Sequence, residues 1–230
     1  MQGPVIMRTL ILLLAVSASL LHAEIVDRIV ALVDGRVITE SAALEEANYQ
    51  AFDQNLEPVT ALDGQSLRLV VSRMADQVLL EKEESNSPFS PPSSGDAERT
   101  LSGIRKRWPD AEQFQRALAR YHLNEGGMTQ RILRQQRILG FVDYQLRPRV
   151  SLEPGRVETY YRETLLPELQ QQGQSETPPL EEVRAQIQQV LIQQEINRLL
   201  DEWLVQLRSH AKIRMMPSAD NDPATPGLPK

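Results

Sequence analysis

Few residues of this chain have the types and spacing that catalysis requires. After residue 23 the chain has two histidines, His122 and His210, which lie far apart in the sequence, and neither has a metal-ligating residue at helical spacing. The chain has no Cys, which excludes disulfides, thiolate metal sites and cysteine nucleophiles together. Serines are densest between residues 85 and 94, and no G-x-S-x-G motif pairs one with an oriented base. We therefore expect both histidines to be structural or solvent-facing.

The carboxylates and glycines also lack the spacing of a known site. Glutamates cluster at 45–46, 81–84 and 181–182, where they could bind Ca²⁺ or act as acids and bases, but EF-hand spacing is missing. We interpret these clusters as solvated helix surface, and the last one as favouring a helix N-terminus. The pair Gly126-Gly127 lacks the lysine and the preceding strand of a phosphate-binding loop. The sequence thus predicts no catalytic residue, no metal and no cofactor.

The N-terminal segment predicts export. Arg8 precedes an apolar run over residues 10–16, and Ala23 offers a signal-peptidase cleavage site. We expect a signal peptide over residues 1–23, cleavage after Ala23 and a periplasmic location without stable membrane insertion. Retention as a signal anchor is the alternative, because the apolar run with its flanks could cross a membrane if it were not cleaved. The net charge of −6 disfavours a nucleic-acid partner.

Hydrophobic periodicity predicts a mainly α fold with a small antiparallel sheet. The β-branched run of residues 25–33, the turn Asp34-Gly35 and residues 36–38 predict a hairpin, and residues 211–215 alternate like a short strand. We expect this last strand to pair with the first one, because a two-stranded hairpin is marginal in water. Helices are expected over the following segments: from the N-cap Thr39 through Ala51, 67–82, 101–108, 110–121, 128–146, 153–165 and 180–210.

Three segments are expected to lie outside the helices and strands. Residues 85–95 predict a loop, residues 169–179 a polar linker, and residues 217–230 a disordered tail. The chain from 24 to 216 is expected to form a single domain. The apolar stripe over residues 183–207 could be a partner-binding face, a coiled-coil seam or core, and we favour core.

Several segments together resemble a known family. Residues 25–39 read IVDRIVALVDGRVIT, and the helix over 67–82 begins with Leu-Arg and pairs its apolar positions. Val150-Ser151 leads to Tyr160-Tyr161, and residues 204–213 run from a helix into a strand. In this order the segments resemble the non-catalytic module of the SurA, PpiD and PrsA chaperones. That family carries a parvulin prolyl isomerase domain where this chain has only residues 168–179, which is too short for an independent domain.

The resemblance implies a helical SurA-like chaperone module without the isomerase. Its expected function is that of an ATP-independent holdase, not an enzyme, which binds unfolded or partly folded envelope polypeptides, outer-membrane proteins among them, through apolar grooves. A structural or adaptor subunit that binds one folded envelope partner is the alternative. An active prolyl isomerase is disfavoured by the missing insertion. The oligomeric state is open, and a dimer is one of the alternatives.

Large side chains near predicted turns are the candidates for contact with a client polypeptide. Aromatic rings and Met supply much apolar area for each side chain, so a groove that they line would bind apolar segments. The candidates are Tyr49, Phe52, Phe89, Phe114, Tyr121, Met128, Phe141, Tyr144, Tyr160 and Tyr161.

Overall fold

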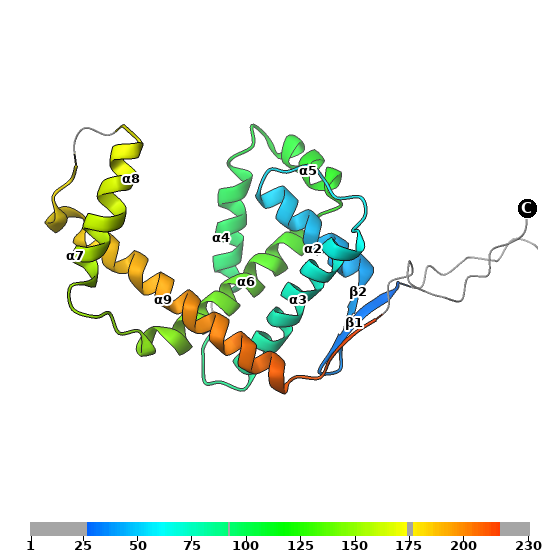
Figure 1. Ribbon diagram of the computed structural model, residues 1–230. Coiled ribbons are helices and arrows are strands. Elements are labelled where there is room, and N and C mark those ends of the chain that lie inside the picture. The colour runs from blue at the N-terminus through cyan, green and yellow to red at the C-terminus, as the bar shows by residue number, and fades with distance from the viewer. Residues whose placement is uncertain (1–26, 92, 174–176, 217–230) are drawn as a thin grey trace, which may run out of the picture.

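The computed structural model describes residues 27–91, 93–173 and 177–216. In these ranges the chain is mainly α with one three-stranded antiparallel sheet, which confirms the predicted fold class (Figure 1). The expected signal peptide over 1–23 and the expected tail over 217–230 lie outside the described residues. The elements are β1 (Ile29–Val33), β2 (Arg36–Thr39), α2 (Glu40–Asp53), α3 (Gly64–Ser85), α4 (Ser94–Arg105), α5 (Ala111–Arg120), α6 (Glu125–Leu146), η1 (Arg147–Arg149), α7 (Arg156–Tyr160), η2 (Tyr161–Leu165), α8 (Leu166–Gln171), α9 (Leu180–His210) and β3 (Ile213–Met215).

The hairpin of β1 and β2 turns at the predicted dipeptide. Asp34 and Gly35 both have positive φ, 47° and 89°, as a two-residue turn that matches the twist of the strands requires. The register of β1 shifts between Ile29 and Ala31, so Val30 is the extra residue of a β-bulge. The bulge explains why two consecutive residues, Val30 and Ala31, are both buried.

The last strand pairs with the first, as predicted from the sequence. The strand order is β2-β1-β3, and β3 is antiparallel to β1 with Ala31 opposite Met215. Asp34 N donates to Lys212 O at 3.1 Å, and Met216 N donates to Val30 O at 2.9 Å. Residues 180 positions apart are therefore joined in one sheet.

Polar side chains fix the starts of four helices. The Oγ1 atom of Thr39 accepts from the backbone N–H of Ala42, which confirms the predicted N-cap of α2. Asp110 begins α5 in the same way, as predicted, by accepting from Gln113 N at 2.7 Å. The side chains of Asp63 and Asn124 cap α3 and α6. Helix α6 ends at Leu146, two residues before Pro148, as expected.

The buried side chains form three clusters. The first joins the inner face of the sheet to α2 and α3, around Val33, Ala43 and Val71. The second joins the end of α2 to α4, α5 and the start of α6, around Phe114. The third joins α3 and α6 to the C-terminal half of α9, where Ile196 is 2 % exposed. The apolar stripe of α9 is thus core over this half, as we had favoured.

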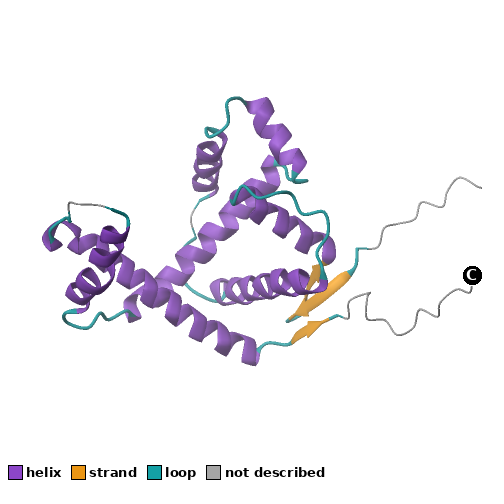
Figure 2. Ribbon diagram, turned by 45° about the horizontal axis from the view of Figure 1, so that its top comes forward, coloured by secondary structure: helices purple, strands orange, loops and turns teal. Residues whose placement is uncertain are grey.

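The N-terminal half of α9 packs away from this body, against α7, η2 and α8. Figures 1 and 2 show α9 running from the sheet to this second group of helices, which we call the lobe. The residues of α7, η2 and α8, all described, include none that is buried. Ile187 and Leu191 of α9 are buried, at 3 % exposure each. A single layer of helices thus leaves the apolar residues of the lobe half-exposed.

The predicted helix over 153–165 differs from the structure at both ends. It begins at Arg156, because Gly155 at φ 82° turns the chain out of helical geometry. We expected it to end before Pro167, but it continues through this residue as η2 and α8. Proline has no N–H, and its ring collides with the carbonyl four residues earlier. The turn before Pro167 widens into a π-helix over Tyr161–Leu165, which accommodates the proline without ending the helix.

Three other predicted boundaries differ from the structure. Helix α4 begins at Ser94, inside the predicted loop, because Ser93 and Asp96 form a capping box. It ends at Arg105, so Trp108 lies beyond it. The predicted linker over 169–179 begins later than expected, because α8 extends to Gln171.

Candidate functional site

A concave surface lies along α3 and α6, and we call it the α3–α6 groove. It consists of two hollows that share Arg134 and Ile138, with volumes of about 650 Å³ and 370 Å³. The first hollow is closed by the turn of the hairpin, and the second by α2. Both are open to solvent, so the groove exposes a continuous surface that joins the sheet to the helical body.

Four apolar side chains line the first hollow among polar and charged ones. Val33 at the end of β1 is fully buried, and Val78 of α3 is packed against the same cluster. Leu133 and Ile138 of α6 complete the lining from the other side. These residues lie within one hollow because they alternate with charged positions at helical spacing on two adjacent helices.

Ion pairs form the rim of the first hollow. Arg36 of β2 and Arg134 of α6 both bind the carboxylate of Glu81, the latter with Nε at 3.3 Å from Oε1. At the hairpin turn, Lys82 Nζ lies 2.6 Å from Asp34 Oδ2. Each of these charges therefore has an ion-pair partner within the protein, and one positive charge is in excess.

Glu84 is the deepest charge of the groove. Its side chain is 5 % exposed, and Arg137 Nη2 donates to its two carboxylate oxygens at 2.8 and 2.6 Å. We had interpreted the glutamates of 81–84 as solvated helix surface, and for Glu84 this interpretation is wrong. The position faces α6 instead of solvent, and an ion pair compensates the loss of hydration. The paired charge on α6, Arg137, lies 53 positions later in the sequence, so local pattern gave no signal for it.

Asp34 joins three parts of the chain at the end of the groove. Its carboxylate accepts from Lys82 Nζ at 2.6 Å and from the backbone N–H of Lys212 at 2.8 Å. The hydrogen bond from Lys82, followed by that from the backbone of Lys212, holds the pKa of Asp34 below its ordinary value. The same contact with Asp34 raises the pKa of Lys82. One carboxylate thus fastens β3 and α3 to the hairpin turn.

The second hollow has a mostly polar lining, into which one aromatic and three aliphatic side chains are set. Tyr49 of α2 lies there with its hydroxyl 3.3 Å from Gln135 Oε1, and Arg131 lies over its ring at 5.4 Å. Burial, followed by the nearby carboxylates of Asp53 and Glu46, raises the pKa of Tyr49. Leu139 of α6 lines the same hollow and is 60 % exposed. This side of the groove therefore presents apolar surface directly to solvent.

Four of the ten candidate client-binding residues belong to the core. Phe114 and Phe141 are fully buried, Met128 is 1 % exposed and Tyr121 is 7 % exposed. The Tyr121 hydroxyl donates to Leu56 O at 2.6 Å, which satisfies its polar atom inside the core. These four side chains are unavailable to a client in this conformation. We had placed them near turns, but the helices that follow those turns fold back over them.

The other six candidates lie at four different places, and whether they contact a client stays a prediction. Tyr49 lines the groove, while Phe52 stacks on Trp108 within the second cluster. The Phe89 ring packs beside Tyr144, at 5.6 Å between centroids, and against Gly140 of α6. Tyr160 and Tyr161 lie in the lobe, half-buried.

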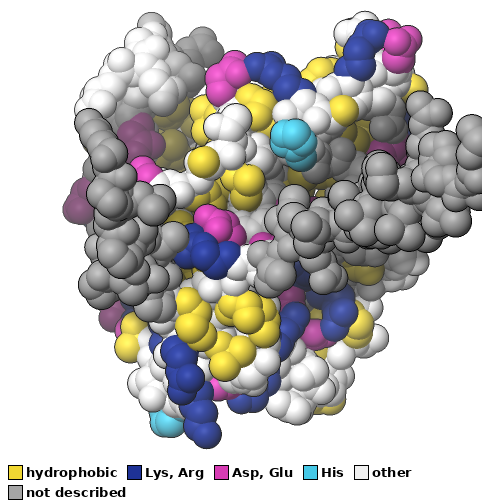
Figure 3. Space-filling view, turned by 90° about the vertical axis from the view of Figure 1, so that its right-hand side faces the viewer, with side chains coloured by type: hydrophobic (Ala, Val, Ile, Leu, Met, Phe, Trp, Pro, Cys, Tyr) yellow, Lys and Arg dark blue, Asp and Glu magenta, His cyan; other side chains and the backbone are white. Residues whose placement is uncertain are grey.

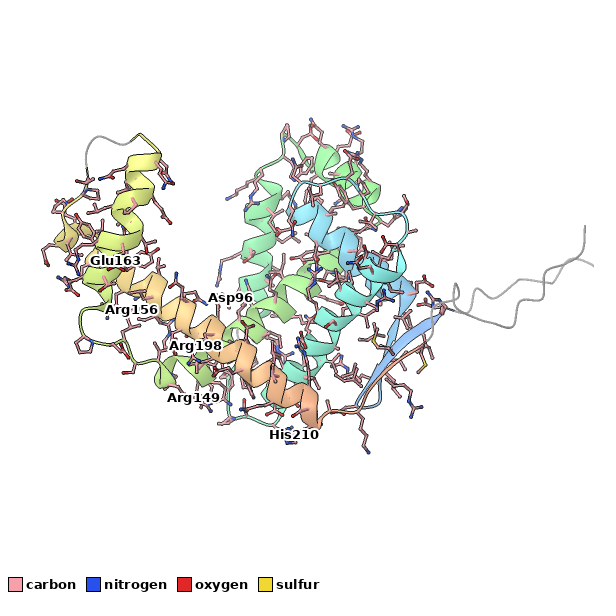
Figure 4. All side chains as sticks on the ribbon, in the orientation of Figure 1. Asp96, Arg149, Arg156, Glu163, Arg198 and His210 are labelled. Carbon is pink, nitrogen blue, oxygen red and sulfur yellow. The ribbon has the colours of Figure 1, made fainter. Side chains whose placement is uncertain are left out.

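The lobe is fastened by polar contacts across its helices. The Tyr161 hydroxyl donates to Pro178 O at 2.8 Å, and Arg184 Nη1 lies 2.6 Å from Glu158 Oε1. Figure 4 shows Arg156 and Glu163 at this end of α9, with His210 at the other end beside the sheet.

Neither histidine takes part in a constellation that performs chemistry. His122 is exposed, with a positive φ of 56°, and turns the chain between α5 and α6. His210 is exposed, and its Nδ1 lies 2.8 Å from Gln206 O at the end of α9. Within residues 27–91, 93–173 and 177–216, no group of acidic or histidine side chains is arranged to hold a metal ion. None of the helices described there is long and apolar enough to cross a membrane.

Sequence comparison assigns the chain to no known group. No protein-family model matches it, and no curated protein matches it either.

Proposed function

We propose that this protein is an ATP-independent periplasmic holdase that binds unfolded or partly folded polypeptides, outer-membrane proteins among them, without catalysing a reaction. The observation that carries the proposal is the α3–α6 groove, in which apolar side chains lie among ion pairs. An unfolded chain presents apolar side chains between polar ones in no fixed order. A long open surface with several apolar contact points suits such a ligand better than one deep pocket.

The exposed apolar side chains supply the attraction. Leu139 is 60 % exposed in the second hollow, and Tyr144, one helical turn and a residue further along α6, is 49 % exposed. Each contact with such a residue buries little area and is weak. Several contacts together would give an affinity near the micromolar range, roughly −8 kcal/mol, from which a folding client escapes by burying its own apolar surface. Release therefore needs no nucleotide.

The ion pairs of the rim keep the protein soluble and let the groove bind clients that differ in charge. Arg36 and Arg134 share the carboxylate of Glu81, and Lys82 is paired with Asp34, so only one positive charge of these three is in excess. A client is therefore not required to supply a particular charge at the first hollow. The net charge of −6 adds mutual repulsion between copies, which keeps a protein with exposed apolar groups in solution.

Suppression of aggregation tests the proposal. The chain from 24 to 230 should prevent the aggregation of an unfolded outer-membrane barrel, followed by light scattering at molar excess. Leu139→Glu should weaken this effect because it places a charge in the groove. Val205→Glu is the matched control, since Val205 is 63 % exposed on α9 and lines neither hollow.

Two results would count against the proposal. Absence of any suppression by the unmodified chain would contradict the holdase activity itself. Equal losses in both variants would contradict the assignment to the groove. Recovery of one folded partner in stoichiometric amount from envelope extracts, instead of many unfolded clients, would favour the adaptor alternative.

A further inference from the structure

The outer edge of β3 presents backbone groups that β1 does not use. Two hydrogen bonds, from Asp34 N to Lys212 O and from Met216 N to Val30 O, lie at the two ends of the paired segment. Hydrogen-bonded and non-hydrogen-bonded residue pairs alternate along an antiparallel ladder. The backbone N–H and C=O groups of Arg214 therefore point toward β1. The N–H and C=O groups of Ile213 and Met215 then point the other way. Within the described residues, β3 is an edge strand with no partner on that side.

The apolar and the basic side chains of β3 lie on opposite faces of the sheet. Ile213 and Met215 lie opposite Val33 and Ala31 and share the inner, apolar face with them. Ile213 is 37 % exposed and Met215 is 45 % exposed, because nothing among the described residues covers them at the edge. Arg214 lies on the outer face, opposite Leu32. Figure 3 shows hydrophobic side chains next to Lys and Arg side chains on this side of the protein.

A hollow beside β3 lies on the side of the hairpin, because Leu32, Asp34 and Gly35 line it together with the strand. It has a volume of about 690 Å³ and lies between the hairpin turn, the end of α9 and β3. Its lining includes Ile213, Arg214 and Lys212 from the strand, and His210 and Lys82 beside it. Asp34 of this lining is paired with Lys82, so the side chains of Lys212 and Arg214 are the charges that favour an acidic occupant.

We propose that an extended segment of a client polypeptide pairs with the outer edge of β3 as a fourth strand. The proposal rests on the proposed holdase function and names the part of the client that is recognised, namely its backbone in an extended conformation. Main-chain hydrogen bonds give affinity to any sequence that can extend, and alternate side chains give the preference. The preferred segment alternates apolar residues, which meet Ile213 and Met215, with acidic residues, which meet Arg214 and Lys212.

The charges of β3 favour a client over a second copy of this chain. An antiparallel pair of two β3 strands centred on Arg214 would place this residue directly opposite its own copy. Like charges opposite each other destabilise a strand pair, and basic residues on edge strands are a common protection against self-association. A segment with glutamate or aspartate at that position forms a favourable pair instead.

Ile213→Pro tests the proposal without removing a bond of the native sheet. Proline has no N–H, but the N–H of residue 213 points away from β1, and proline is tolerated at such positions of edge strands. Ile213→Thr is the control that keeps both the N–H and a β-branched side chain. Binding of a labelled peptide that alternates valine and glutamate is measured by fluorescence anisotropy, with the chain from 24 to 230. The proline variant should bind about tenfold more weakly, and the threonine variant nearly as well as the unmodified protein.

The peptide supplies a second test that does not depend on the stability of a variant. N-methylation of alternate residues removes its hydrogen-bond donors on one edge and should also weaken binding about tenfold. A peptide that alternates valine and lysine should bind more weakly than the glutamate peptide, and the difference should shrink at high salt.

Three outcomes would overturn the proposal. The first is unchanged binding by a folded Ile213→Pro variant, and the second is unchanged binding of the methylated peptide. The third is a wild-type dimer that becomes a monomer in Ile213→Pro, which would assign the edge to a second copy. The barrel aggregation assay separates this proposal from the holdase function. Unchanged peptide binding by a folded Ile213→Pro variant refutes the β3 edge alone, whereas absence of suppression by the unmodified chain refutes the function.

Discussion

Replacing Arg137 by alanine should destabilise the protein far more than replacing Arg134, one turn earlier on the same helix. Arg137 is the partner of Glu84, whose side chain is 5 % exposed. Removal of one member of a buried ion pair leaves an uncompensated charge and destabilises a fold by about 3–5 kcal/mol. The side chain of Arg137 is itself 43 % exposed, so solvent screens part of this penalty. We therefore expect a loss of about 2 kcal/mol.

Arg134 is a close control because it also binds a glutamate of α3. Its side chain is 47 % exposed, and Glu81 keeps Arg36 as a second partner when Arg134 is removed. Arg134→Ala should therefore cost about 0.5 kcal/mol, as an exposed ion pair does. Both variants remove the same guanidinium group, so the difference between them measures the burial of the carboxylate.

Urea unfolding, monitored by circular dichroism, measures the free energy of unfolding of both variants. For a chain of this length, a loss of about 2 kcal/mol lowers the melting temperature by roughly 4–8 °C. Glu84→Met added to Arg137→Ala should recover much of the loss, because it removes the stranded charge and fills the space with an apolar side chain. Equal destabilisation by Arg137→Ala and Arg134→Ala would refute the reasoning, since it would mean that water reaches Glu84.

Three further predictions follow from particular contacts. Deletion of residues 211–230 should lower the melting temperature, because it removes β3; an unchanged value would contradict the pairing with β1. Gly140→Ala should stabilise the protein more in a Phe89→Ala background than alone, because the new methyl group would lie 3.0 Å from the Phe89 ring. Urea unfolding of the unmodified protein, the two single variants and the double variant measures this difference, and additive changes in the free energy of unfolding would contradict the contact. The hydrogen bond from Lys82 is the first cause of the lowered pKa of Asp34. The ionised carboxylate therefore stabilises the folded protein at pH values above its ordinary pKa of about 3.8. This stabilisation is lost as the pH falls through the pKa of Asp34 in the folded protein. The difference in stability between the unmodified protein and Asp34→Asn should thus vanish in acid, and a constant difference from pH 7 to pH 2 would contradict it.

The helices were predictable where their own side chains determine them. The periodicity of α3 and the cap of α2 by Thr39 depend on residues within one or two turns, and both predictions are confirmed. The hairpin was predictable for the same reason, since Asp34-Gly35 adopts the two positive φ angles that its turn requires. The error at Pro167 shows the limit of this approach. Whether a proline ends a helix or widens it depends on what the following turn packs against.

The candidate site was predictable only in part. Tyr49 lies in the groove as a large side chain near a turn, and it was among the ten candidates. Phe114 and Phe141 had the same sequence signal but are fully buried. Leu139 is highly exposed, although it sits in the same apolar run as Ile138. Which face of a helix is buried depends on the elements that pack against it, and the sequence alone does not reveal where α9 packs on α6.

The sequence alone therefore determined the mainly α class, the hairpin, the long helix over 180–210 and the lack of a local catalytic motif. These properties follow from backbone preferences and from hydrophobic spacing over short distances. The tertiary structure decided which apolar residues stay exposed, that Glu84 and Arg137 form a buried pair, and which backbone groups of β3 stay open at the edge. Each of these depends on contacts between segments far apart in the chain, whose energies arise only when packing brings the two partners together.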